Sequence, residues 1–535
     1  MQTMQSMDWD SLSAFLKKHI RFFFCLAVSL AAGFAAHGYF YTGIGFSQDS
    51  LMLFTNDVKW QISLGRFMIP VYYYLRGRYT VPWLLGLYCI LYAAISANLI
   101  ASMMKIRKAG HLALLCCVIL TNAAVTAQTA TYVHVIDIYM LGFLLATLSV
   151  WLLQRFRFGF LAGIPVLMMS VGLYPAYFAA AAALCVLLVI MHLLDNAVSP
   201  KQLWCLIGKA LCLLIAGLLL YAVMVKLALL IGGAAISQGY NGIAGVGDFS
   251  KVNVFQLLAN LYRYVIRFLR VPTANQPNLI KWINLLMGLA TLLQLLRMAW
   301  QRRSAWWRLV LTGIALLLLP FAANATYFLS KGMLHGVMTM PLYLLYLFVL
   351  LTQAWAQDPQ PDAAETPHAP RWLRLLAASL IPLLLCIWSV DNIQFSNASY
   401  LKKRLEAQST VTVMSRVIDR IEETEGYEPE QTMVAFIGDL NLNKHLTASR
   451  PSFEQLAYTG DRVPGYEYSF GVSYPWSYRY FMEYYLGYPM RMAFEPEIAR
   501  LAATETVQAM PDFPDPDCVR WVDDILVVKL SDQTY

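Results

Sequence analysis

Charged residues are scarce in this chain, and their scarcity decides its class. Only 13% of the 535 residues are charged and 59% are hydrophobic, with a mean hydropathy of +0.52. A soluble domain carries roughly 25% charged residues, and it could not cover so much apolar surface. Soluble enzymes, nucleic-acid binders and disordered regulators are therefore excluded. The net charge of +8 is interpreted by its position along the chain, and no nucleic-acid partner is expected.

The patterns of several common chemistries are also missing. The chain has no metal-ligand spacing of His, Cys, Asp and Glu, no phosphate-binding P-loop and no Gly-x-Ser-x-Gly element. Neither a nucleotide-driven pump nor a serine hydrolase is suggested. Of the nine cysteines only Cys518 lies in a polar region, so no disulfide framework is expected. No cofactor is expected either, although a divalent metal stays open.

Long apolar runs, in contrast, are abundant. A helix needs roughly 20 residues to cross about 30 Å of hydrocarbon, and the strands of a membrane barrel are far shorter. The sequence therefore predicts an all-α polytopic membrane bundle of about eleven transmembrane helices. The expected spans are residues 21–41, 81–104, 111–128, 136–154, 159–174, 176–194, 203–231, 282–300, 307–328, 337–355 and 373–391. The fifth and sixth are short and divided at Pro175, so a re-entrant pair is the alternative.

Basic residues in short loops set the orientation, because such loops stay in the cytoplasm. They precede the first span and recur in alternate connections: Lys17, Lys18, Arg21, Lys105, Arg107, Lys108, Arg155, Arg157, Lys201, Arg302, Arg303, Arg308, Arg371 and Arg374. The N-terminus is therefore expected in the cytoplasm, and an odd number of spans places everything after Asp391 outside. The opposite loops also carry some positive charge, and these exceptions are where functional residues are expected: Lys59, Arg66, Arg76, Arg78, Arg263, Arg267 and Arg270.

The composition changes after the last span. Residues 395–535 hold most of the acids and no run long enough to cross a bilayer. The sequence thus predicts a transmembrane domain over residues 1–394 and a small extracytoplasmic α/β domain over residues 395–535. A helix at about 400–424 and strands at 433–437 and 525–528 are expected in it.

Aromatic residues crowd the segment between those two strands. They are Tyr466, Tyr468, Phe470, Tyr474, Trp476, Tyr478, Tyr480, Phe481, Tyr484, Tyr485 and Tyr488. Such rings either pack the domain or rest on the membrane interface. The alternative is that some of them stack on sugar rings.

The first outer loop is the most informative segment. Asp49 and Asp57 lie just beyond the first span. A carboxylate at a membrane boundary can act as general base for a sugar hydroxyl that attacks an anomeric carbon, and a solvated loop acid is the alternative. Trp60, Gln61 and Arg66 follow them, and a ring, an amide and a guanidinium are groups that hold a sugar and a phosphate.

Three stretches of this sequence together carry a family resemblance. They are Asp49 to Leu51 with Trp60 to Phe67, Tyr132 to Tyr139 with Asp137 among them, and Leu173 to Tyr177. They resemble the Gtr type II glucosyltransferases, which modify bacterial surface polysaccharides such as O-antigen. That family commonly has Gln at the position of Pro175, so a side-chain contact is expected to be missing. The resemblance covers roughly the first 390 residues and leaves the C-terminal domain unmatched.

The resemblance implies a GT-C type membrane enzyme. Such an enzyme transfers a sugar, here glucose, from a polyprenyl-phosphate donor to a cell-surface polysaccharide or glycolipid acceptor. The reaction is expected on the outer face of the bacterial cytoplasmic (inner) membrane. By the same analogy Asp49 is the expected base, Asp57 is its alternative and Asp137 is a second acid that orients the acceptor. Tyr177, in the third stretch, is an expected substrate contact.

The donor phosphate requires cations. Arg263, Arg267 and Arg270 recur at spacings of four and three, so they share one face of a helix expected from about Val254 to Val271. That face is either a clamp for the lipid-linked phosphate or a basic surface on anionic headgroups in general.

A second outer loop also carries positive charge, at Lys331 and His335. These two residues contact phosphate or are simply solvated.

A transporter or flippase of polyprenyl-linked sugars is the rival hypothesis. It predicts charged residues along a path inside the spans. The main ones are Lys209 and Lys226, and both can extend toward an edge of the bilayer. A lipid-carrier polymerase or ligase, which differs in acceptor and donor size, is not separated from the transferase by sequence.

Overall fold

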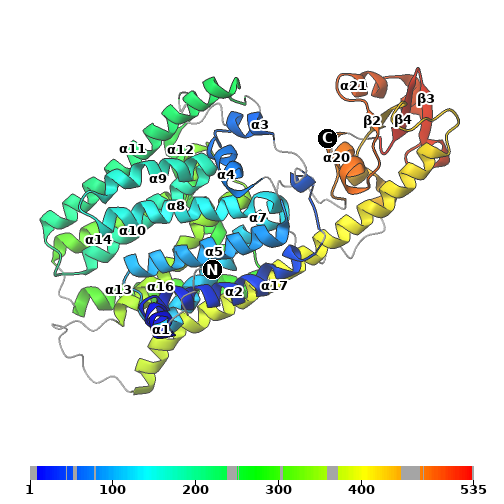
Figure 1. Cartoon of the computed structure of the whole chain (residues 1–535). Helices are drawn as coiled ribbons and strands as arrows, with labels where there is room; N and C mark the ends of the chain where they lie inside the picture. Colours follow the sequence, from blue (N-terminus) through cyan, green and yellow to red (C-terminus); the bar gives the residue numbers. More distant parts are fainter. Residues whose placement is uncertain are drawn as a thin grey trace, which may run out of the picture.

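In the computed structural model most of the chain forms a bundle of long helices, with a smaller α/β unit beyond one end of it (Figure 1). The structure describes residues 9–43, 45–47, 49–51, 57–77, 80–237, 250, 252–301, 305–357, 371–447, 470–473 and 475–532. Within these residues, 8 helices are long and apolar enough to cross a membrane, and three shorter apolar helices accompany them. The prediction of an all-α polytopic membrane protein is confirmed.

The helices of the bundle follow the predicted spans closely. They are α1 (Trp9–Lys18), α2 (Ile20–Tyr41), α5 (Pro82–Met103), α6 (Ala109–Leu120), α7 (Ala123–Tyr132), α8 (Ile136–Arg155), α9 (Gly159–Leu173), α10 (Phe178–Leu194), α11 (Pro200–Gly232), α13 (Pro277–Gln301), α14 (Trp306–Ala323), α16 (Leu344–Ala356) and α17 (Arg371–Glu422). Shorter helices lie in the connections: α3 (Val58–Ser63), α4 (Met68–Arg76), α12 (Val254–Arg270) and α15 (Ala325–Leu329), with the 3-10 turns η2 (Val133–Val135), η3 (Pro175–Tyr177), η5 (Gly336–Met338) and η6 (Met340–Tyr343).

The third predicted span, residues 111–128, differs from the structure because it is divided into α6 and α7 at Asn122. The Asn122 side chain accepts hydrogen bonds from the N–H groups of Ala124 and Val125 at 3.1 and 3.2 Å, and it caps α7. Its amide nitrogen donates to the carbonyl oxygens of Val118 and Ile119 near the end of α6. One buried asparagine therefore satisfies backbone groups of both helices at the break.

The fifth and sixth predicted spans correspond to α9 and α10. Tyr174 has an extended backbone between them, and Pro175 opens η3 because it has no N–H to continue α9. α9 packs between α8 and α11, and α10 packs against α14 and α8. Both helices thus belong to the body of the bundle (Figure 1).

The last predicted span and the predicted helix at about 400–424 form one continuous helix. α17 runs for 52 residues, from Arg371 to Glu422, because no glycine or proline interrupts the chain where its apolar half gives way to its amphipathic half. Figure 1 shows α17 passing along the bundle and continuing into the α/β unit. The predicted domain boundary at residues 394 and 395 lies inside this helix.

The described part of the C-terminal unit consists of the last turns of α17 and residues 423–447, 470–473 and 475–532. Its four-stranded sheet has the order β2-β1-β4-β3, from β1 (Met433–Ile437), β2 (Arg491–Met492), β3 (Val519–Val522) and β4 (Ile525–Lys529). The two strands predicted from the sequence, β1 and β4, are parallel neighbours. Short helices surround the sheet: α18 (Lys444–Thr447), α20 (Pro475–Tyr480) continuing into the π-helix η8 (Phe481–Tyr485), α21 (Glu497–Ala502), α22 (Glu505–Ala509) and the turns η7 (Leu440–Leu442) and η9 (Pro516–Cys518).

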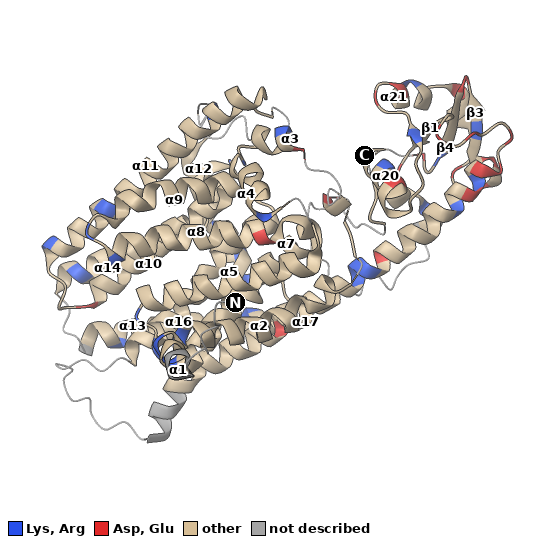
Figure 2. Ribbon diagram, in the orientation of Figure 1, with Lys and Arg blue, Asp and Glu red and all other residues tan. Residues whose placement is uncertain are grey.

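Charged residues are concentrated at the helix ends and on the C-terminal unit (Figure 2). At the end of the bundle away from that unit, Arg308 is buried and donates to the carbonyl oxygens of Leu193 and Asp195 at 3.2 and 2.9 Å. Those carbonyls end α10, where a cation is favourable. Lys105 contacts the Asp195 carboxylate at 3.4 Å nearby.

One carboxylate of the C-terminal unit predicts a pH dependence of stability. Asp439 follows β1, is 1% exposed and accepts hydrogen bonds from Asn441 and the Ser473 hydroxyl. Burial raises its pKa from 3.8 to about 6. Folding therefore favours the protonated form, and the stability present below about pH 4 is lost as the pH rises through about 6.

We expect Asp439→Asn to remove this loss of stability with rising pH. The thermal midpoint of the variant, measured for the full chain in detergent, should gain on that of the native chain as the pH rises from about 4 to about 7. The exposed Asp524 supplies the matched control, Asp524→Asn, whose midpoint should stay at a constant offset. A constant offset for Asp439→Asn as well would show that the Asp439 carboxyl does not titrate in this window.

Candidate active site

A cavity of about 340 Å³ opens where the loop between α2 and α5, the ends of α7, α8 and α9, and the C-terminal unit meet. Its volume falls in the range of ligand pockets, about 300–1,000 Å³. Rings dominate the wall, and two carboxylates and a guanidinium join them. The lining residues are Asp49, Asp57, Trp60, Gln61, Leu64, Arg66, Ile69, Tyr73, Tyr132, His134, Val135, Ile138, Tyr139, Tyr174, Trp476 and Tyr480. Five of the sequence-predicted site residues are thereby brought together: Asp49, Asp57, Trp60, Gln61 and Arg66.

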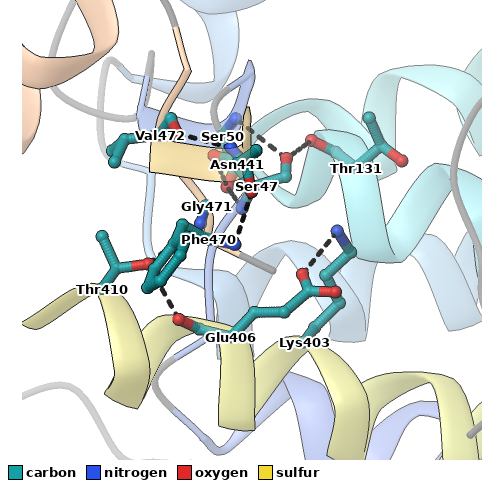
Figure 3. Close-up of polar contacts among 10 residues, drawn as sticks. All are labelled: Ser47, Ser50, Thr131, Lys403, Glu406, Thr410, Asn441, Phe470, Gly471 and Val472. Atoms are coloured by element: carbon teal, nitrogen blue, oxygen red, sulfur yellow. Dashed lines mark hydrogen bonds and ion pairs between the residues drawn. The ribbon is translucent and has the colours of Figure 1, made fainter. Parts of the chain in front are cut away.

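Asp49 stands on a short turn that is fixed by the serines on either side of it. The Ser47 hydroxyl donates to the Thr131 carbonyl oxygen of α7 at 2.7 Å, and the Ser50 hydroxyl donates to the Ser47 carbonyl oxygen at 2.9 Å (Figure 3). The Ser47 N–H donates to the Ser50 hydroxyl oxygen at 2.8 Å. These bonds hold the turn without using the Asp49 side chain, which is half-buried in the cavity wall.

Asp57 also lines the cavity, but its carboxylate has a structural task. It is the N-cap of α3, and its Oδ1 accepts a hydrogen bond from the Trp60 N–H at 2.9 Å. The residue is exposed. Asp57 thus has a structural role besides its place in the cavity wall, and Asp49 stays the predicted base.

The run from Trp60 to Phe67 forms most of α3 and the turn at Gly65 that follows it. α3 carries Trp60 and Gln61 into the cavity wall, and Gly65 then turns the chain with φ +72°. A Cβ on Gly65 would lie 2.5 Å from the Tyr221 hydroxyl, so both the conformation and the space require glycine. The turn places the Arg66 guanidinium 5.0 Å above the Tyr174 ring, where the ring face attracts a cation.

Asp137 lies beside the cavity and does not line it. The residue is 0% exposed, and both its carboxylate oxygens accept from Arg76 Nη1 at 2.8 Å. Tyr72 donates a further hydrogen bond at 2.9 Å. In the structure Asp137 forms a buried ion pair with Arg76. Its predicted role, orienting the acceptor, stays a prediction.

Sequence reasoning named Arg76 only as one of the basic residues against the positive-inside trend, and it did not select His134. Arg76 Nε and Nη2 and His134 Nδ1 are buried and have no hydrogen-bond partner among the described residues, and His134 lines the cavity. The available signal was the position of Arg76 against the positive-inside trend. The rings Trp476 and Tyr480 were likewise present in the aromatic stretch, but nothing in the sequence joined them to the first loop.

Tyr177 supports the cavity wall from behind. It is 1% exposed, its hydroxyl accepts from Gln128 Nε2 at 3.2 Å, and its ring lies 5.8 Å from the Tyr174 ring. It lies outside the set of described residues that line the cavity. Its predicted contact with substrate stays a prediction.

The remaining predicted cations lie away from this cavity. Arg263, Arg267 and Arg270 are exposed on α12, which was predicted correctly within one residue and packs on α13, α14 and α15. Lys331 and His335 are half-buried in the connection between α15 and η5. None of the five is among the described residues that line the cavity, and their contact with phosphate stays a prediction.

A family model described as glucosyl transferase GtrII matches residues 38–352. The match begins near the end of α2 and ends within α16, and it is more than half of the chain. The chain belongs to the glucosyl transferase GtrII family. Neither the curated proteins nor the solved structures that were compared include a match to it. Within this transferase, every cavity residue lies in the matched region except Trp476 and Tyr480.

A resident metal was left open by the sequence. In the described part of the transferase, no three or more of its His, Cys, Asp and Glu residues come together as metal ligands would.

Proposed function

We propose that this glucosyltransferase moves glucose from a polyprenyl-phosphate donor to a hydroxyl of a cell-surface polysaccharide or glycolipid. The reaction would take place on the outer face of the bacterial cytoplasmic membrane. The observation that carries the proposal is the cavity itself, in which a half-buried carboxylate, Asp49, and a guanidinium, Arg66, share one ring-lined space. Its place at the ends of the apolar helices lets a lipid-linked donor keep its tail in the bilayer.

In this mechanism Asp49 accepts the proton of the acceptor hydroxyl. The hydroxyl oxygen then bonds to the anomeric carbon, the bond from that carbon to the phosphate oxygen breaks, and polyprenyl phosphate leaves with the electron pair. Attack from the side opposite the phosphate inverts the configuration. Negative charge grows on the departing phosphate, and a fixed cation there lowers the barrier.

Arg66 is the cation that the geometry favours for the phosphate. Its guanidinium is held over the Tyr174 ring at the cavity wall, and a guanidinium matches phosphate oxygens in two parallel hydrogen bonds. The exposed arginines of α12 would instead meet lipid headgroups. The donor phosphate is thereby assigned to Arg66 and the bilayer surface to α12.

Replacing Arg66 with Met tests that assignment. Loss of a charged hydrogen-bond donor to phosphate should lower kcat/KM for the donor about 10- to 100-fold. The assay measures transfer of labelled glucose from polyprenyl-phosphate-glucose to surface polysaccharide extracted from the source cells. Arg267→Met on α12 is the matched control and should change kcat/KM only a few-fold. If Arg267→Met were the more damaging change, the phosphate would belong to α12.

The donor class is tested with the native chain in purified membranes. Transfer should occur from polyprenyl-phosphate-glucose and not from UDP-glucose in membranes free of polyprenyl phosphate. Efficient direct use of UDP-glucose would disprove the lipid donor. Movement of the labelled lipid between leaflets, with no labelled polysaccharide, would favour the transporter hypothesis, which the family membership otherwise disfavours.

A further inference from the structure

The aromatic stretch of the C-terminal unit separates into two sets in the structure. Phe470, Tyr478 and Phe481 are 0 or 1% exposed and belong to the core of the unit. Trp476 and Tyr480 are half-buried at the cavity, and Tyr484 is 40% exposed. Tyr466, Tyr468 and Tyr474 lie outside the described residues. Tyr480, Tyr485 and Tyr488 are partly buried and pack against the same core. Packing on the core thus accounts for the first set and only in part for Tyr480, which also lines the cavity.

The three outer rings form a row. Trp476, Tyr480 and Tyr484 recur every four residues along α20 and η8, so they share one face of a continuous helical segment. The ring centroids of Trp476 and Tyr480 are 5.9 Å apart, and those of Tyr480 and Tyr484 are 5.8 Å apart. The buried Tyr478 and Phe481 lie on the opposite face of the same segment.

The row extends from the cavity wall to the surface of the C-terminal unit. Trp476 and Tyr480 share the cavity wall with Asp49, and Tyr484 continues the row onto the surface. Beside the row, Arg479 and Glu483 form an exposed ion pair at 3.4 Å. Aromatic rings can stack on the C–H faces of a sugar, and charged groups beside them can form hydrogen bonds with its hydroxyls. Such a surface is suited to binding a saccharide.

We propose that Trp476, Tyr480 and Tyr484 form the acceptor subsite and bind a saccharide chain. Sugar units stack along the row, and the unit at Trp476 presents its hydroxyl to Asp49. This inference rests on the proposed function, and it selects a polysaccharide over a single-sugar glycolipid headgroup as acceptor. Because the row belongs to the C-terminal unit, it lies outside the region that the family model matches.

The experiment uses the full chain in membranes with polyprenyl-phosphate-glucose as donor. The acceptors are oligosaccharides of graded length, prepared from surface polysaccharide of the source cells. For the native chain, acceptor KM should fall as the oligosaccharide becomes long enough to cover three rings. Tyr484→Ala should remove the gain from the longest oligosaccharides, and Trp476→Ala with Tyr480→Ala should raise acceptor KM about tenfold or more. Donor KM should change less than about twofold.

The matched control is Trp521→Ala, since Trp521 is 39% exposed on the edge strand β3 of the same unit. It should leave both KM values unchanged. If the ring variants altered donor KM as much as acceptor KM, or only lowered the amount of protein in the membrane, the rings would serve the bilayer interface and the proposal would fail. A native chain that used the graded acceptors only with another sugar donor would overturn the proposed donor and leave this subsite standing.

Discussion

Asp49→Asn is expected to lower kcat for glucosyl transfer by about 10²- to 10⁴-fold, the usual contribution of a general base. Asparagine keeps the size of the side chain and loses the ability to accept the proton of the acceptor hydroxyl. The turn should survive, because the bonds of Ser47 and Ser50 to each other and to Thr131 do not depend on the Asp49 carboxylate. Acceptor and donor KM should therefore change much less than kcat.

Asp57→Asn is the matched control for this change. Asp57 lines the same cavity, but its observed task is to cap α3, and asparagine caps a helix about as well as aspartate. Transfer is measured in membranes with equal amounts of each protein, and Asp57→Asn should retain activity within a few-fold. A reversed order of the two variants would make Asp57 the base. Activity that survives both changes together would refute carboxylate catalysis in this loop.

The spans could be predicted because each apolar run is a local property of the sequence. Ile20–Tyr41, Pro82–Met103 and Pro200–Gly232 end within a few residues of the predicted limits. The division at Asn122 was missed, because the apolar run gives no sign that the Asn122 side chain caps α7 and bonds to the end of α6. The single helix from Arg371 to Glu422 was also missed, because a change of composition was interpreted as a break.

The members of the candidate site were less predictable than the spans, because a cavity depends on contacts between distant segments. The first loop was selected from its acids and its family-like run, and five of its selected residues line the cavity, while their roles stay predictions. The partner of Asp137 is Arg76, 61 residues away, and no local pattern joins the two. The same is true of Trp476, which shares the cavity wall with Asp49 only because the C-terminal unit packs on the first loop.

That packing connects the two parts of the chain through the residues beside Asp49. Phe46 and Leu51 are each 0% exposed and belong to the hydrophobic core of the C-terminal unit. The Phe46 ring lies 5.1 Å from Phe481, and a Cβ on Gly471 would come within 2.4 Å of the Phe46 ring. The turn that carries Asp49 is therefore held at both ends by the unit that supplies the acceptor rings.

The polar contacts at this junction extend the same connection. Asn441 Oδ1 accepts from the Phe470 N–H at 2.8 Å and Asn441 Nδ2 donates to the Val472 carbonyl oxygen at 2.9 Å, while the Gly471 N–H donates to the Thr410 hydroxyl of α17 at 2.9 Å (Figure 3). Residues 470–472, against which Phe46 packs, are thus hydrogen-bonded to Asn441 on one side and to Thr410 of α17 on the other. Phe46 is accordingly expected to act as a positioning residue for Asp49.

Phe46→Ala is expected to destabilise the C-terminal unit by about 3–5 kcal/mol, because it leaves a cavity the size of a phenyl ring in a closed core. It should also lower kcat by about 10²-fold, since a base displaced by about 1 Å loses its geometry with the acceptor. The two effects are separated by Phe513→Ala. Phe513 is 1% exposed in the same core but is remote in sequence from the turn that holds Asp49. It should lower the thermal midpoint by a similar amount.

The decisive comparison is kcat at a temperature where both variants remain folded. Phe513→Ala should then transfer glucose at nearly the native rate, and Phe46→Ala should not. Phe46→Leu, which refills most of the space, should recover activity together with stability. Equal kcat for the two alanine variants would mean that Phe46 serves only the stability of the unit. Unequal kcat at equal stability, with acceptor KM unchanged, would show that the C-terminal unit sets the position of Asp49. A raised acceptor KM would instead show that Phe46 acts through Phe481 on the rings Trp476 and Tyr480.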